Sequence, residues 1–247
     1  MKTVLWREVK GELTAPITAI GHFIVPIFYV VFFAAAFGSN ISHIAYRNLP
    51  FRYTEFFIPG VIAFQTFSLF SWTFSMVRID RASNIVAIFL TSGVHPTIYF
   101  AGKLIASILI TTVRCLIVLG ISLSLAYVTL PSLANLGIAF TGLLLGSVVW
   151  LCLGFICGVF ITREDLRDIV FSILTLPITF TSSMYYNIEL APQWVRAIGK
   201  FNPLTYTADT IRCGMLGLKV SSSNLLILAL SCAVSLSLAL RACRRMS

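Results

Sequence analysis

Six stretches of the chain are long enough and apolar enough to cross a lipid bilayer as helices. A hydrocarbon core of about 30 Å takes about 20 helical residues, and an apolar run of that length is typical of a transmembrane segment. Hydrophobic residues make up 58% of the chain, and the mean hydropathy is +0.93. The sequence therefore predicts an all-α membrane protein with six transmembrane helices, near 17–37, 57–77, 104–130, 136–161, 169–186 and 224–240.

The residues outside these runs occur only in short pieces, so we expect a single membrane domain over 1–247. It divides into an interface segment at 1–16, four spans within 17–161, and a last part, 162–247, that holds two spans and an outer segment at 187–217. We expect no cleaved signal peptide, because the polar N-terminal region is long and of mixed charge.

The net charge of +9 predicts membrane orientation rather than nucleic-acid binding, because the basic residues stand mostly at the ends of apolar runs. With a cytoplasmic N-terminus, the inner segments carry eleven Lys and Arg and the outer segments carry six, four of them in one long loop. Cytoplasmic segments are enriched in positive charge, so both termini are predicted to be cytoplasmic.

Two polar segments on that side have helical patterns. Residues 2–14 alternate charges with apolar positions near one face, which predicts an amphipathic helix in the membrane interface with Trp6 at head-group depth. Between the second and third spans, Ile85, Ile88 and Phe89 recur at helical spacing and predict a short cytosolic helix near 80–92. Both segments have a simpler alternative: a polar tail that happens to be helical, and a connector that packs back on the membrane domain.

Motifs for catalysis and nucleotide binding are absent from the sequence. It contains no G-x-x-x-x-G-K-[ST] phosphate loop, no H-E-x-x-H and no G-x-S-x-G. The histidines, His22, His43 and His95, lie far apart, and the six cysteines form no Cys-x-x-Cys pair. We therefore expect no enzyme activity, no metal site, and no cofactor bound by this chain.

Two features inside the predicted spans have more than one explanation. Arg114 lies within the third span, where it either extends to the inner head groups or Asp168, or lines a substrate path. In the second span Phe64, Phe67 and Phe74 share a helical face. They either line a pathway for an acyl chain or drug, or pack against lipid and neighbouring helices.

The segment between the last two spans, GKFNPLTYTADTIRCGML at 199–216, contains a helix start. Asn202 is a good N-cap, Pro203 suits the first helical position, and Asp209 and Arg212 are spaced to pair. A preceding short helix opens at Pro192. We predict a re-entrant pair of outer helices that forms an outer gate, and the alternative is a loop on the head groups. The proposed gate residues are Asn202, Pro203, Leu204, Tyr206, Asp209 and Arg212.

The chain resembles the membrane subunits of ABC-2 type exporters, the family of drug-resistance permeases, nodulation-factor exporters and channels for lipid-linked polysaccharides. The resemblance rests on IPGVIAF at 58–64, TREDLRDIVFSILTLPITFTSSMYY at 162–186 and LAPQWVRAIGKFNPLTYTADTIR at 190–212. One departure is Ala82 after Asp80 and Arg81, where family members often carry a glutamate.

The resemblance implies a homodimer of permeases in the plasma (inner) membrane of a prokaryote, each bound to a separate cytosolic ATPase that holds ATP and Mg. The short cytosolic helix would contact that ATPase, and the N-terminal helix would flank the contact. The residues implied are Asp80, Arg81, Asn84 and Ile85 for coupling, and Trp6, Arg7 and Glu8 in the interface helix.

The cargo stays open between a drug or hydrophobic small molecule and a lipid-linked glycan. The alternative function is a secondary transporter or channel that works without an ATPase, and an intramembrane enzyme comes third. The absence of carboxylates inside the predicted spans argues against proton coupling but not against a passive pore.

Overall fold

A computed structural model describes residues 2–14, 21, 24–33, 36–37, 43–129, 131–161 and 163–245. Within them the chain is mainly helical, with one small antiparallel hairpin. In chain order the elements are α1 (Lys2–Thr14), a π-helix (Tyr29–Phe33), β1 (Ile44–Tyr46), β2 (Leu49–Phe51), α4 (Tyr53–Ala82), α5 (Ile85–Thr91), α6 (Pro96–Ser124), α7 (Leu133–Phe160), α8 (Glu164–Phe180), a 3₁₀ turn (Ile188–Leu190), α9 (Gln193–Gly199), α10 (Pro203–Leu216) and α11 (Ser222–Cys243).

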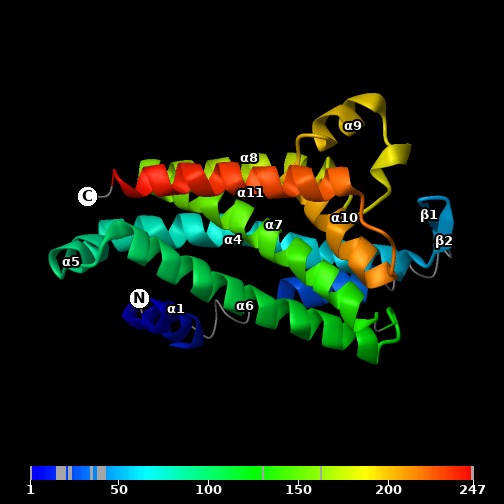
Figure 1. Cartoon of the computed structure of the whole chain (residues 1–247), viewed down its shortest axis with the longest axis horizontal. Helices are drawn as coiled ribbons and strands as arrows, with labels where there is room; N and C mark the ends of the chain where they lie inside the picture. Colours follow the sequence, from blue (N-terminus) through cyan, green and yellow to red (C-terminus); the bar gives the residue numbers. More distant parts are fainter. Residues whose placement is uncertain are drawn as a thin grey trace.

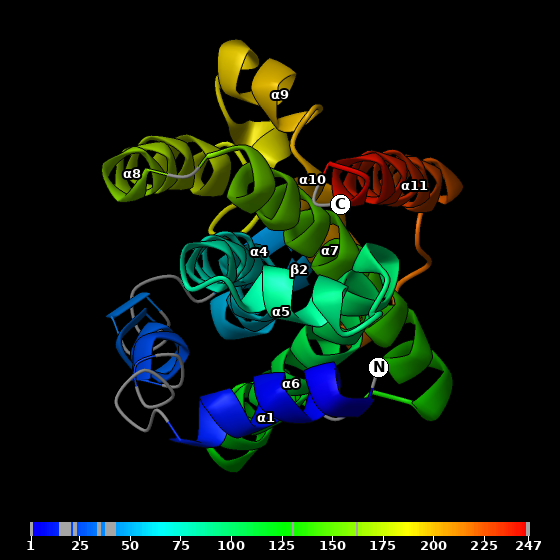
Figure 2. The ribbon, with the colours of Figure 1, turned by 90° about the vertical axis from the view of Figure 1, so that its left-hand side faces the viewer.

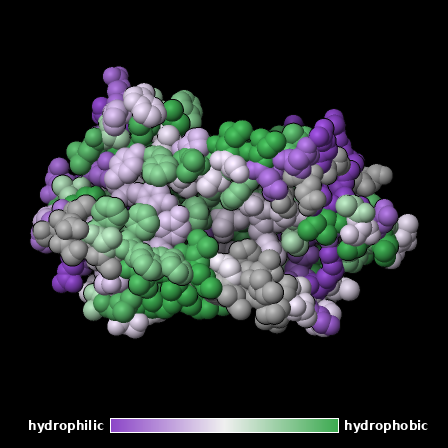
Figure 3. Space-filling view, turned by 180° about the vertical axis from the view of Figure 1, so that it is seen from behind, coloured by the Kyte–Doolittle hydropathy of each residue, from purple (hydrophilic) through white to green (hydrophobic). Residues whose placement is uncertain are grey.

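The long helices run side by side along the longest axis of the molecule (Figure 1). Both ends of the chain lie at one end of this bundle, together with α1 and α5, whereas the β-hairpin and α9 lie at the other end. Seen from behind, hydrophilic side chains lie towards both ends and apolar side chains occupy much of the region between them (Figure 3). This distribution suits a bundle whose middle faces hydrocarbon and whose ends face water.

Helix α7 lies at the centre of the packing. It contacts α4, α10 and α11, and it lies between α8 and α11 when the bundle is seen from the end where the chain begins (Figure 2). Helices α4 and α7 come so close that a Cβ on Gly154 would lie 2.3 Å from the Phe70 carbonyl oxygen. Small residues permit such close contact between membrane helices, where hydrophobic burial supplies little driving force.

Four of the predicted spans are confirmed as helices of sufficient length and hydropathy within the described residues: α4, α6, α7 and α11. The third prediction, 104–130, is wrong at its C-terminal end, because α6 stops at Ser124. The fifth prediction is wrong at its C-terminal end, because α8 stops at Phe180 and residues 181–186 form a turn and bends. Of the first predicted span, the structure describes an apolar helix at Ile24–Phe33, and 17–20, 22–23 and 34–35 lie outside the described residues.

The polar helices are also present, with one boundary corrected. Helix α1 covers the predicted residues and packs along α6. The helix predicted near 80–92 starts later, since α4 continues through Ala82 and α5 begins only at Ile85. Asp80 and Arg81 therefore belong to the last turn of a long helix. Asn84 separates α4 from α5 in the left-handed conformation, with φ of 55°, which asparagine tolerates better than most residues.

Candidate functional site: two polar clusters and an aromatic groove

Helix α10 begins as the sequence predicts. The Asn202 side-chain oxygen accepts a hydrogen bond of 3.0 Å from the Leu204 backbone N–H, and Pro203 occupies the first helical position. The Asn202 amide also donates to the Ile178 carbonyl at 2.6 Å and to the Thr181 hydroxyl at 3.2 Å. Asn202 therefore starts α10 and ties it to the C-terminal end of α8.

Helix α10 is buried within the bundle rather than resting on its surface. It packs against α4, α7 and α11, and Leu204 and Ala208 are both fully buried. The contact with α7 needs glycine, since a Cβ on Gly146 would lie 2.5 Å from the Thr207 methyl group. The neighbouring Thr210 satisfies its buried hydroxyl on the Tyr206 carbonyl at 2.7 Å.

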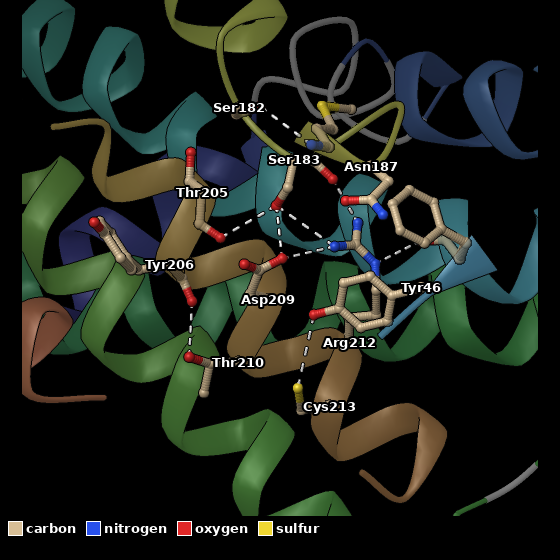
Figure 4. A network of polar contacts seen from close by, with 12 residues as sticks. Tyr46, Ser182, Ser183, Asn187, Thr205, Tyr206, Asp209, Thr210, Arg212 and Cys213 are labelled. Atoms are coloured by element: carbon tan, nitrogen blue, oxygen red, sulfur yellow. Dashed lines mark hydrogen bonds and ion pairs between the residues drawn. The ribbon is translucent and has the colours of Figure 1, made fainter. Parts of the chain in front are cut away.

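Arg212 is the largest fully buried side chain of the described residues, with no exposed surface (Figure 4). Its guanidinium donates to the Phe56 carbonyl at 3.0 Å, the Ser183 carbonyl at 2.6 Å and the Asp209 carboxylate at 2.9 Å. The predicted pair with Asp209 is confirmed. The same group lies 3.7 Å from the centre of the Phe56 ring, so charge, hydrogen bonds and an aromatic face all compensate its burial.

Further polar groups join Arg212 and Asp209 in one cluster, which we call the outer cluster because it lies at the end of the bundle predicted to face outward. The Ser183 hydroxyl donates to the Asp209 carboxylate at 2.8 Å, and the Tyr206 hydroxyl donates to the Lys200 carbonyl at 2.7 Å. Tyr46 of β1 lies 5.3 Å from the Arg212 guanidinium, and burial raises its pKa above the ordinary value. The outer cluster therefore joins the hairpin, α4, the segment after α8, and α10.

The two predicted outer helices differ sharply in burial. Helix α9 buries Val195 but leaves Trp194 65% and Ile198 49% exposed, and Phe201 beyond it is 89% exposed. Only α10 enters the bundle. Exposed aromatic and aliphatic side chains at this position suit contact with lipid at the membrane surface.

A second buried polar cluster lies at the end of the bundle that holds the chain termini. The Asp80 carboxylate of α4 pairs with Arg7 of α1, accepts from the Tyr99 hydroxyl at 2.5 Å and lies 2.9 Å from the Lys103 ammonium of α6. Lys103 also pairs with Glu8 at 2.8 Å. Asp80 is 1% exposed and Lys103 2% exposed, so two positive and two negative charges balance in a largely buried setting.

This second cluster, of Arg7, Glu8, Asp80, Tyr99 and Lys103, is called the inner cluster because it lies at the end of the bundle predicted to face the cytoplasm. It fixes α1 on α4 and α6. Burial lowers the pKa of Arg7, but the hydrogen bond and charge of Asp80 outweigh it and raise that pKa above the ordinary value. Trp6, by contrast, is 61% exposed and its ring lies 4.4 Å from the Lys10 ammonium. Arg7 and Glu8 thus face the bundle, while Trp6 faces outward.

The residues predicted for coupling separate into an inward and an outward group. Asp80 belongs to the inner cluster, and the Arg81 guanidinium donates to the Val159 carbonyl at the end of α7. Asn84 is exposed and Ile85 half-buried. The structure therefore places Asp80 and Arg81 where they hold helices together, and Asn84 where a partner has access.

The predicted pathway residues also separate. Phe67 and Phe74 are fully buried, and Phe67 packs edge-on against Trp150 at 4.7 Å. Arg114 is 3% exposed within the bundle. Phe64 lies at the wall of a groove of about 550 Å³, together with aromatic and apolar side chains of α4, α8 and the helix at Ile24–Phe33. This aromatic groove is lined by Tyr29, Phe33, Phe37, Ile44, Tyr53, Phe64, Thr175, Leu176, Thr179, Phe180, Tyr185 and Tyr186.

Sequence reasoning missed several residues of these clusters. Lys103 looks like a basic residue at the end of an apolar run, and Tyr99 and Ser183 look like ordinary members of a helix and a loop. One signal was present: Tyr99 and Lys103 stand four residues apart and so share a helical face. Within the described ranges no group of three His, Cys, Asp or Glu side chains is placed to hold a metal ion.

The sequence model of the ABC-2 type transporter family matches residues 1–216. The chain is 26% identical over 201 residues to a putative transport permease, ycf38, of Cyanophora paradoxa, covering 80% of this chain and 67% of that protein. It is 24% identical over 217 residues to the daunorubicin resistance ABC transporter permease protein DrrB1 of Streptomyces coeruleorubidus, covering 85% and 72%.

A third relative is the inner membrane transport permease YadH of Escherichia coli strain K12, which is 25% identical over 213 residues, covering 81% of this chain and 76% of YadH. All three relatives are named as transport permeases. The family match extends over most of the chain and includes both polar clusters and the aromatic groove. The chain therefore belongs to the ABC-2 type transporter family.

Proposed function

We propose that this chain is the membrane-spanning permease subunit of an ATP-driven exporter, which moves a bulky amphiphile out of the cytoplasm or the inner leaflet. A separate cytosolic ATPase binds ATP and Mg and supplies the energy. The observation that carries the proposal is the placement of α5, which lies at the same end of the bundle as both chain termini and α1.

Helix α5 packs against the bundle on one side and exposes an apolar side chain to such a partner on the other. Val86 is 8% exposed, and the Phe89 ring packs 6.0 Å from the Tyr99 ring. On the opposite side Ile88 is 61% exposed. An exposed isoleucine on a short polar-flanked helix suits a small hydrophobic contact with another protein.

Force applied to α5 reaches the membrane helices through short connections. Asn84 joins α5 directly to α4, and the turn before Pro96 joins it to α6. The inner cluster ties the same two helices to α1 through Asp80 and Lys103. A rigid α1–α4–α5–α6 unit would let ATP binding and hydrolysis bias the bundle between a closed and an open pathway.

The aromatic groove supports an amphiphilic substrate. Its lining is mainly aromatic and apolar and suits the hydrophobic part of such a molecule, and ring pairs such as Phe33 with Phe57 at 5.4 Å and Phe180 with Tyr185 at 5.6 Å stabilise its walls. Drugs and lipid-linked glycans both carry such a hydrophobic part. Because the relative DrrB1 is named for daunorubicin resistance, a hydrophobic drug is the first substrate to test.

A second copy of the chain would complete the pathway. Along α8, Ile169, Ile173, Leu176 and Phe180 are each more than half exposed and recur on one face. This apolar face beside the aromatic groove suits a partner permease or lipid.

We further propose six spans, with α8 and the helix at Ile24–Phe33 as the two short ones, and cytoplasmic termini in the plasma (inner) membrane of a prokaryote. Helix α10 and the outer cluster would form the outer gate.

The test is co-purification of the tagged full-length chain with an ABC-type ATPase identified by peptide mass spectrometry, followed by measurement of ATP hydrolysis. Ile88→Asp should abolish the complex, because a charge would enter the proposed contact. Leu133→Asp, which alters an 86% exposed leucine at the opposite end of the bundle, is the matched control and should leave the complex intact. Equal recovery of the ATPase with both variants would rule out α5 as its contact.

A further inference from the structure

A polar cavity of about 400 Å³ opens at the end of the bundle opposite the chain termini, within the size range of small-molecule sites. The β-hairpin, the segment after α8, α9, α10 and the start of α11 all contribute to it. Its lining consists of Tyr46, Arg47, Ser183, Asn187, Ile188, Glu189, Arg196, Gly199, Lys200, Thr205, Tyr206, Asp209, Ser221 and Asn224.

The charges around this outer cavity favour an anion. Arg47, Arg196 and Lys200 supply three positive charges. Two acidic residues line the outer cavity. Asp209 is already neutralised by the buried Arg212, which leaves Glu189 alone against the three cations. The outer cavity therefore carries a surplus of two positive charges.

The three cations differ in whether their side chains already make hydrogen bonds. Arg47 stands in the hairpin turn and donates to the Lys219 carbonyl at 2.5 Å. The Arg196 and Lys200 side chains are exposed and make no hydrogen bond or ion pair with any residue in the described ranges. Since guanidinium and ammonium groups bind phosphate oxygens strongly, these two side chains are free to bind an anionic ligand.

The start of α11 adds to the same preference. Ser221 and Asn224 line the outer cavity, and α11 is a 22-residue helix whose N-cap residue, Ser221, makes no side-chain cap hydrogen bond. The Ser221 hydroxyl instead pairs with that of Ser223 at 2.7 Å. The positive end of this helix favours an anion in the outer cavity.

Neutral hydrogen-bonding groups complete the lining. Thr205 is only 6% exposed, and its hydroxyl has no hydrogen-bond partner within the described part of the chain. The amide of Asn224 and the hydroxyl of Ser221 also line the outer cavity. The neutral hydroxyl and amide side chains of this lining suit a ligand with hydroxyl groups beside its negative charge.

We propose that the outer cavity binds a glycerophosphate group. The phosphate lies against Arg196, Lys200 and the start of α11, and the glycerol hydroxyls face the neutral polar lining. This group occurs at the head of an anionic phospholipid such as phosphatidylglycerol, and also as a free solute.

The test uses the full-length protein in a neutral, non-ionic detergent, with dissociation constants measured by microscale thermophoresis. The probes are short-chain phosphatidylglycerol, short-chain phosphatidylcholine and glycerol 1-phosphate. Arg196→Gln combined with Lys200→Gln removes two cations from the outer cavity. The matched control, Arg52→Gln combined with Lys219→Gln, removes two exposed cations from the same end of the bundle that do not line it.

Binding of phosphatidylglycerol should weaken about tenfold or more in the cavity variant and less than about twofold in the control, since each lost cation removes a charge-assisted hydrogen bond. If glycerol 1-phosphate binds as tightly as phosphatidylglycerol and shows the same loss, the ligand is a free solute; if it binds much more weakly, the ligand is a lipid. Equal affinity for phosphatidylcholine and phosphatidylglycerol, or equal loss in both double variants, would overturn the proposal.

Discussion

Substitution of Asp80 by Asn tests the inner cluster while keeping the size of the side chain. The change removes the negative charge that faces Arg7 and Lys103, and it replaces one of the two acceptor oxygens by an NH2 group, which can only donate. Two positive charges then remain against Glu8 alone, so an unbalanced positive charge is left largely buried.

The magnitude follows from the distances. One pair of unit charges 2.9 Å apart, as between Asp80 and Lys103, interacts by about 6 kcal/mol at an effective dielectric constant of about 20, before desolvation is subtracted. Breaking a buried pair by removing one partner costs about 3–5 kcal/mol. We expect a loss of this size in the free energy of unfolding, together with detachment of α1.

Two measurements on the purified full-length protein check this prediction. Thermal unfolding in detergent should show a lower midpoint, and trypsin should cleave after Lys10 faster than in the unsubstituted protein, because α1 no longer packs on α6. Asp165→Asn is the matched control, since the Asp165 carboxylate is 55% exposed in its 2.6 Å pair with Arg163. It should change neither readout. An Asp80→Asn protein with the same midpoint and the same cleavage rate would refute the structural role of the inner cluster.

Three further predictions concern packing, the outer cluster and topology. Gly154→Ala should destabilise the protein by about 1–3 kcal/mol, because the added methyl group meets the backbone of α4, whereas Gly120→Ala, with open space around it, should be neutral or stabilising in thermal unfolding. Arg212→Met should cost about 3–5 kcal/mol in the same assay, because it leaves the half-buried Asp209 carboxylate without its positive partner and two carbonyl oxygens without this donor; an unchanged midpoint would contradict that role. In a cysteine-free background, a membrane-impermeant maleimide should label Gln193→Cys in intact cells and Asn84→Cys only after the membrane is opened, and labelling of both from outside would contradict the proposed topology.

Local features of the sequence were predictable where their cause is local. The start of α10 follows from Asn202 and Pro203, whose capping geometry depends on adjacent residues alone. The pair between Asp209 and Arg212 follows from helical spacing. The long apolar helices follow from run length, since no water is available to backbone groups within a bilayer.

Tertiary placement was not predictable from the same patterns. Nothing local to Arg212 indicates that it binds the Phe56 carbonyl, 156 positions away. Lys103 has the same sequence context as an interfacial lysine, yet it is 2% exposed because charges on α1 and α4 surround it. Likewise, helical spacing groups Phe64 with Phe67, but only neighbouring helices decide that the first lines a groove and the second is buried.

The most direct test of the proposed function is transport by vesicles of defined composition. The full-length chain is reconstituted with its ATPase, and export of a fluorescent amphiphilic drug is measured with and without ATP. Transport should require both the ATPase and ATP hydrolysis and should fail with Ile88→Asp. Equal transport by vesicles that contain this chain alone would show that it is a stand-alone transporter or channel and would refute the proposed function.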